Sequence, residues 1–259
     1  MQIEAILFVN WIFWAALSAG TLLVVGLTER LGGTTRGYRL FMAWLLVAFA
    51  AILVASDLAL PPASQASATE SLRRPLTFIF AAGSAAYLVA SMARWPRSGL
   101  AIGAALIGLA AMVVLAAAGG SVSPALFAGQ LVLAALALGA VNAAMLLGHW
   151  YLVTPKLSPA PLRRMMWLLI VTLGLQAVAF GIAIASGGTD ALEGGIGILT
   201  WLRLGVGIVL PIAATMLAIL ASSASSLQAS TGLLYIGLAL IMAGSIAGAS
   251  ITYLTGVPV

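Results

Sequence analysis

The hydrophobic positions of this sequence fall into long continuous runs, which short polar segments separate. Most runs reach the length of about 20 apolar residues that a helix needs to cross the hydrocarbon core of a bilayer. The pattern predicts eight such helices, near residues 5–27, 40–60, 76–93, 99–118, 125–153, 165–186, 197–221 and 230–254. Because the runs lack the alternation of a membrane β-barrel, we expect helices, which satisfy their own backbone hydrogen bonds in lipid.

The connections between these runs are short and rich in residues that break helices. Gly32-Gly33, Pro61-Pro62 and Gly119-Gly120 mark three of them. The longest connection on the predicted outer side, near residues 61–75, has room for a short surface helix. We find no linker to a second domain and no sequence repeat between the two four-helix halves. The sequence therefore predicts an all-α, polytopic membrane bundle that forms a single domain over residues 1–259.

Composition narrows the class of protein further. Hydrophobic residues make up 63% of the chain and charged residues 7%, whereas a soluble domain usually carries about a quarter charged residues. This balance excludes a soluble enzyme, a disordered chain and a nucleic-acid-binding protein. The chain has no cysteine and one histidine, so we expect no thiolate metal site, no cysteine-ligated cluster and no bis-histidine haem within it.

The positive charges are unevenly distributed between the two sets of connections. One set contains Arg30, Arg36, Arg39, Arg94, Arg97, Lys156, Arg163 and Arg164, while the other contains Arg73 and Arg74. Cytoplasmic loops carry the excess of Lys and Arg, so we predict that both termini lie on the outer side of a bacterial cytoplasmic membrane. The net charge of +5 has the same origin. Arg163 and Arg164 are candidates for binding anionic lipid headgroups at the inner surface.

The fifth predicted helix contains the first candidate site. Asn142, Met145 and His149 are spaced by three and four residues, which places them in one column near the inner end of the helix. Gly148 is expected to leave space beside the imidazole, and Tyr151 adds a hydroxyl. Histidine exchanges protons near neutral pH, so the column is a candidate site for quinone. In the alternative, structural interpretation, His149 hydrogen-bonds a neighbouring helix or a lipid headgroup.

The second candidate site consists of two charges predicted to lie inside helices. Asp57 lies about one turn before Pro61, and Arg203 about two turns into the seventh helix, both near the outer side. An unpaired charge there costs several kcal/mol, so we predict that the two side chains pair or share a polar cavity. Asn10 and Gln130 lie in the same outer half. The pair is either a structural ion pair or a quinol pocket, with Asp57 accepting a proton and Arg203 orienting an oxygen.

The last predicted helix leads to a resemblance. From Thr231-Gly232-Leu233-Leu234-Tyr235 to Tyr253 it resembles, in spacing, the last helix of the membrane-anchor subunits of dimethyl-sulfoxide-reductase-type oxidoreductases. The eight spans, the outer termini and the lack of an extramembrane domain are similar to the same group, which includes polysulfide-reductase-like quinol-binding anchors. The resemblance implies a haem-free subunit that exchanges electrons between quinone and an iron–sulfur partner.

Three functions remain open at this stage. The favoured one is an integral membrane subunit of a respiratory or photosynthetic electron-transfer complex, which binds quinone or helps to hold a cofactor among lipids and other redox subunits. It would have no catalytic residues of its own. A haem would need His149 and a second ligand that is not histidine or that a partner supplies. The alternatives are a small-solute transporter or channel, with a seventh helix kinked at Pro211, and a purely structural subunit.

Overall fold

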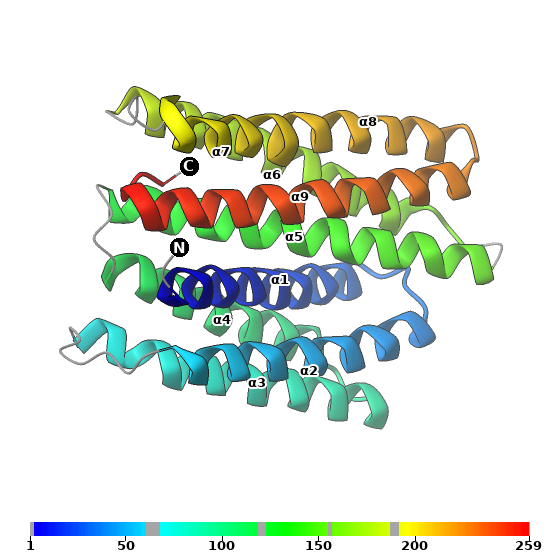
Figure 1. The fold of residues 1–259 in the computed structure, drawn as a ribbon. Coiled ribbons are helices and arrows are strands. Elements are labelled where there is room, and N and C mark those ends of the chain that lie inside the picture. Colours follow the sequence, from blue (N-terminus) through cyan, green and yellow to red (C-terminus); the bar gives the residue numbers. More distant parts are fainter. Residues whose placement is uncertain (1–2, 61–67, 119–122, 155–156, 187–191, 259) are drawn as a thin grey trace.

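The computed structural model describes residues 3–60, 68–118, 123–154, 157–186 and 192–258. Within these ranges the chain forms the helices α1 (Ile3–Leu31), α2 (Arg36–Ala59), α3 (Ala68–Ala93), α4 (Ser98–Ala118), α5 (Pro124–Val153), α6 (Ala160–Ala185), α7 (Gly194–Leu204), α8 (Leu210–Ser223) and α9 (Leu227–Thr255) (Figure 1). The π-helix η2 (Gly205–Val209) joins α7 to α8. With α7, η2 and α8 taken as one, eight segments are long and apolar enough to cross a membrane. This confirms the prediction of an all-α, multi-pass bundle.

The predicted helices match the observed ones to within a few residues, with one informative difference. α3 already begins at Ala68, and its apolar span begins at Leu72. The later part of the expected outer connection therefore belongs to this helix, and residues 61–67 lie outside the described ranges. The start of α1 and the end of α9 lie at the same end of the bundle (Figure 1). We call this the outer end, after the orientation predicted from the basic residues.

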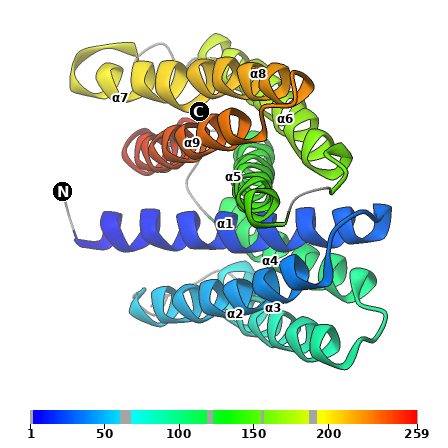
Figure 2. The same cartoon turned by 90° about the vertical axis from the view of Figure 1, so that its right-hand side faces the viewer.

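The bundle divides into two halves with the same packing order. In the first half, α1 packs against α2 and α4, and α3 packs against α2 and α4. In the second half, α5 packs against α6 and α9, and α8 packs against the same two helices. Figure 2 shows the first half below and most of the second half above. The two halves therefore share one order of helix contacts, although their sequences show no repeat.

The two halves meet along α1 and α5, which form the most extensive helix pair of the described chain. The helices approach at Gly20 and Gly139, where a Cβ on either residue would overlap the backbone of the other helix. Asn142 donates a hydrogen bond to the hydroxyl of Thr21, at 3.2 Å, across the same pair. Between helices in lipid, close backbone packing and polar contacts replace the hydrophobic effect as the source of association.

The seventh span is interrupted at the position where the sequence predicts a kink. Pro211 has no backbone N–H, and its ring clashes with the carbonyl of Gly207 in a regular α-helix. The turn widens instead, and the N–H of Leu210 donates to the carbonyl of Gly205, five residues earlier. In this geometry Gly207 lies directly against Gly244 of α9, where a Cβ on Gly207 would be 2.6 Å from the Cα of Gly244.

Candidate functional site: a cavity at a buried arginine

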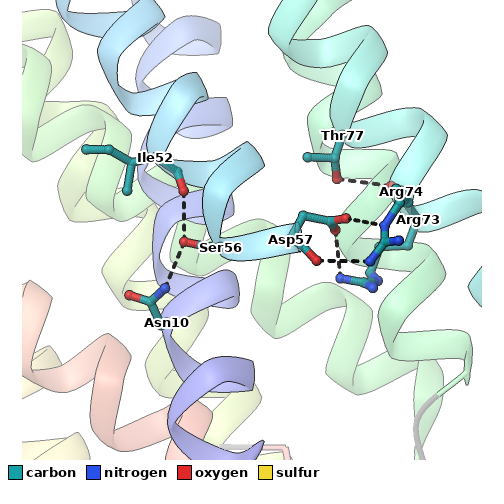
Figure 3. A network of polar contacts seen from close by, with 7 residues as sticks. All are labelled: Asn10, Ile52, Ser56, Asp57, Arg73, Arg74 and Thr77. Carbon is teal, nitrogen blue, oxygen red and sulfur yellow. Dashed lines mark hydrogen bonds and ion pairs between the residues drawn. The ribbon is translucent and has the colours of Figure 1, made fainter. Parts of the chain in front are cut away.

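Asp57 is bound by two arginines of α3 (Figure 3). Its carboxylate is completely buried, with Nη1 of Arg73 at 2.7 Å from Oδ1 and Nε of Arg74 at 3.0 Å from Oδ2. Arg74 also donates to the main-chain carbonyl of Asp57 at 3.2 Å. The predicted pairing of Asp57 with Arg203 is therefore wrong.

The reason is the lateral position of the two residues. Asp57 and Arg73 lie on successive helices of the first half, while Arg203 lies in the second half. Equal depth in the bundle does not bring two side chains together. The guanidinium of Arg73 also lies 5.3 Å from the ring centre of the buried Trp11, a cation–π distance. The acid is thus already held by cations of its own half.

Arg203 has a different environment. The residue is 2% exposed, and its Nε and Nη1 have no hydrogen-bond acceptor. None of the carboxylates with a described side chain pairs with it. A buried charge without a partner costs several kcal/mol in a membrane helix. Such an arginine is expected to meet an electronegative oxygen from outside the chain.

Arg203 lines a cavity of about 30 Å³ between α1, α5 and α9. A buried water needs roughly 10–15 Å³, so the cavity has room for about two waters or for the oxygen atoms of a ligand. Gln130 of α5 and Ser245 of α9 supply its other polar groups with no partner in the described chain. The walls are otherwise mostly apolar and include Ile12, Phe13, Phe127 and Leu131.

The unpartnered hydroxyl of Ser245 is unusual for its helix. Nearby hydroxyls on α9 return their hydrogen bond to the carbonyl four residues earlier, as Ser250 does to Ile246 and Thr252 to Gly248. In the described structure the Ser245 hydroxyl makes no such bond. Together with the amide of Gln130 and the guanidinium, it gives the cavity several free donors beside a fixed positive charge. This arrangement is suited to binding an anion or a carbonyl oxygen.

The column on α5 forms, but its members face different surroundings. Asn142 and Met145 are buried, and the amide of Asn142 is bonded to α1. His149 is exposed, and its Nδ1 lies 3.4 Å from the hydroxyl of Tyr235 on α9. The three side chains therefore do not meet around one ligand, and a quinone or haem at His149 stays a prediction.

Two expectations about the surroundings of His149 are corrected, one by the packing of α9 against α5 and one by a bond to the connection between α5 and α6. Gly148 does not leave open space, because a Cβ there would lie 2.6 Å from the hydroxyl oxygen of Thr231. The hydroxyl of Tyr151 is not free either. It is part-buried and donates to the carbonyl of Ser158 at 2.8 Å. Both groups are thus engaged in holding the inner end of the bundle together.

The inner end presents the predicted lipid-binding arginines. Arg163 and Arg164 are exposed at the start of α6. Arg164 Nη1 lies 3.5 Å from the carbonyl of Leu31, the last residue of α1. Trp167, one turn further along α6, is also exposed, as expected for an aromatic anchor at a membrane interface. Lipid binding by the two arginines stays a prediction.

Sequence reasoning missed two of the residues that define these sites. The sequence predicts that Arg73 lies in an outer connection. Arg73 nevertheless follows Asp57 after a single reversal of the chain, which signals a possible partner. Ser245 follows Gly244 in a stretch of small residues, whose pattern indicates close helix packing rather than a site. Comparison with known protein families, with curated proteins and with solved structures finds no match for this chain. Its class is therefore defined by the fold and the site, as a multi-pass membrane bundle whose buried Arg203 pairs with none of the described carboxylates.

Proposed function

We propose that this protein is a quinone-binding membrane subunit of an electron-transfer complex in a bacterial cytoplasmic membrane. The observation that carries the proposal is the buried Arg203, which has free donors next to the unpartnered Gln130 and Ser245. A quinone oxygen accepts hydrogen bonds and gains negative charge on reduction. A preorganised cation in a water-excluded site stabilises such a charge strongly.

Each residue of the cavity has a defined task in this proposal. A bound quinone takes up or releases electrons and protons. Arg203 donates hydrogen bonds to one headgroup oxygen, and Ser245 and Gln130 fix its orientation. The ring packs against Phe13 and Phe127, since the cavity itself admits oxygen atoms rather than a whole ring. Asp57 has no part in proton transfer here, because both of its carboxylate oxygens are bound to arginines.

The partners follow from the composition. The chain has no cysteine, so any cysteine-ligated iron–sulfur cluster that exchanges electrons with the quinone belongs to another subunit. The spans are joined by short connections, which leaves the helices free to contact neighbouring subunits and lipids. The proposal therefore includes redox subunits as partners.

A small-solute transporter is the second candidate. Two like halves and an interrupted helix beside a polar cavity are features that many transporters share. In this alternative Arg203 binds the anionic group of a solute. A purely structural role, the third possibility, gives no reason to bury an arginine that pairs with none of the described carboxylates.

The test is quinone binding by the protein purified in mild detergent with its native lipids. We expect Arg203→Gln to weaken binding about 10-fold or more, because a hydrogen bond from a charged group contributes about 1.5–3 kcal/mol. Arg36→Gln, at an exposed position of the inner end, is the matched control and leaves the affinity unchanged. Equal affinity of the Arg203→Gln and wild-type proteins would overturn the proposal. Stabilisation by a small anion without quinone binding would favour the transporter.

A further inference from the structure

A second hollow lies beside the Arg203 cavity. It is an open groove of about 240 Å³ between α1 and α9, lined by Ile6, Val9, Asn10, Phe13, Ile246 and Ser250. Ile6 and Ile246 are 50% and 43% exposed. Both residues belong to helices that are long and apolar enough to cross a membrane, so we expect their exposed side chains to face lipid. The groove therefore opens to lipid.

Phe13 connects the two hollows. Its side chain lines the groove on one side and the Arg203 cavity on the other. The residue is mostly buried, so its ring separates an apolar, lipid-facing compartment from a polar one that contains a positive charge. A rotation of the Phe13 ring about its side-chain bonds would open this partition without a change in the backbone.

The chemistry of the groove favours an apolar occupant. Of its two polar residues, Ser250 donates its hydroxyl to the carbonyl of Ile246, and Asn10 donates its amide to Ser56. A polar ligand would therefore find few free partners there. The volume is also too small for a helix of a partner, which has a diameter of about 10 Å. A flexible hydrocarbon chain fits both limits.

We infer that the α1–α9 groove holds the hydrocarbon tail of the ligand whose headgroup binds at Arg203, and that the ligand arrives laterally from the lipid past Phe13. This inference rests on the proposed function and specifies its substrate class, an amphipathic molecule with an electronegative head and an isoprenoid or alkyl tail. Lipid is as apolar as the tail, so the groove contributes packing and orientation rather than hydrophobic burial.

The test compares ligands with and without a tail. Ubiquinone and menaquinone headgroups are each used with a decyl chain and with a methyl group in its place. Filling the groove by Ile246→Trp or Ser250→Phe is expected to weaken binding of the decyl forms about 5-fold or more, since packing of the tail is lost. Binding of the methyl forms stays unchanged, which also shows that the variants are folded. Val178→Trp, at a lipid-facing position of α6 that is 61% exposed, is the control.

The outcomes separate this inference from the proposed function. If the groove variants weaken both forms equally, or neither, the groove does not hold the tail, while headgroup binding at Arg203 stands. If the wild-type protein binds none of the four probes, the proposed function itself is overturned. A loss confined to the decyl forms supports both.

Discussion

Each half contains a buried arginine in its third span, and among the described side chains an acid lies beside Arg73 but not beside Arg203. Arg73 lies at the start of the third span of the first half, which begins at Leu72, and Arg203 lies between two and three turns into the third span of the second half, which begins at Gly194. They are 5% and 2% exposed. Arg73 contacts Asp57 of the preceding helix at 2.7 Å. Arg203 contacts a cavity instead.

The difference shows how one framework gives a structural site and a candidate binding site. A buried cation requires a negative partner to offset its lost hydration. The first half supplies that partner from α2. In the second half the corresponding last turn of α6, from Ile182 to Ala185, is apolar. The charge of Arg73 is thus neutralised within its own half, whereas Arg203 lines a cavity that has room for a ligand.

The largest effect on stability is expected when the carboxylate of Asp57 is removed, because Arg73 then lacks the acid that distinguishes it from Arg203. Asp57→Asn leaves the buried Arg73 without a carboxylate, so we expect a loss of about 3–5 kcal/mol in the free energy of unfolding. The measurement is unfolding by titration with sodium dodecyl sulfate from mild detergent micelles. Glu193→Gln, at an exposed acid, is the control. A loss no larger than in this control would show that Asp57 does not neutralise Arg73.

The next largest effect on stability is expected from a methyl group at the contact between Gly207 and Gly244, next to Arg203. A Cβ at Gly207 would lie 2.6 Å from the Cα of Gly244 and 3.2 Å from Nη1 of Arg203. Gly207→Ala is therefore expected to cost about 1–3 kcal/mol through overpacking, and to weaken ligand binding. Gly205→Ala lies in the same π-helix, where a Cβ meets no atom within 4 Å, and serves as the control. Indistinguishable unfolding curves for the two variants would contradict the close approach of η2 and α9.

Replacing the arginines themselves gives effects of opposite sign. Arg203→Met removes a buried charge that no carboxylate in the described part of the chain compensates, so the ligand-free protein is expected to gain about 1–2 kcal/mol of stability. Arg73→Met removes a paired one and is expected to destabilise. The same detergent titration, carried out without quinone, measures both. If Arg203→Met destabilised the protein as much as Arg73→Met, the second arginine would have a partner within the chain after all.

The smallest effect on stability is expected from the loss of a neutral hydrogen bond in the first half. Asn10 donates to Ser56 at 2.8 Å, between α1 and α2. Asn10→Ala is expected to cost about 0.6 kcal/mol, the average for such bonds between membrane helices. Ser223→Ala, which removes only a bond back to the carbonyl of Ile219 in the same helix, is the comparison and changes stability less. If Ser223→Ala were more destabilising than Asn10→Ala, hydrogen bonds within one helix would contribute more to stability than those between helices.

Hydropathy predicted the depth of each residue but not its neighbours. The eight spans follow from the apolar runs, because a bilayer requires each segment to be long and helical. Asp57 lies in the last turn of α2 and Arg203 between two and three turns into the seventh span, yet the packing order of the helices separates them. That order depends on close contacts such as Gly207 with Gly244, and small residues of this kind occur throughout the sequence. The cavity could therefore not be predicted from the sequence, whereas the position of Arg203 inside the seventh span could.

The contact between Gly20 and Gly139 limits how this molecule is able to move. Transporters with two like halves commonly expose their site to one side and then the other by rocking the halves about a shared interface. Here the backbones of α1 and α5 touch with no side chain between them. Tilting would either drive backbone atoms into one another or open a gap that nothing flexible can fill. We therefore expect this contact to resist tilting of the two halves against each other, and to leave movement to side chains at the edge of the bundle.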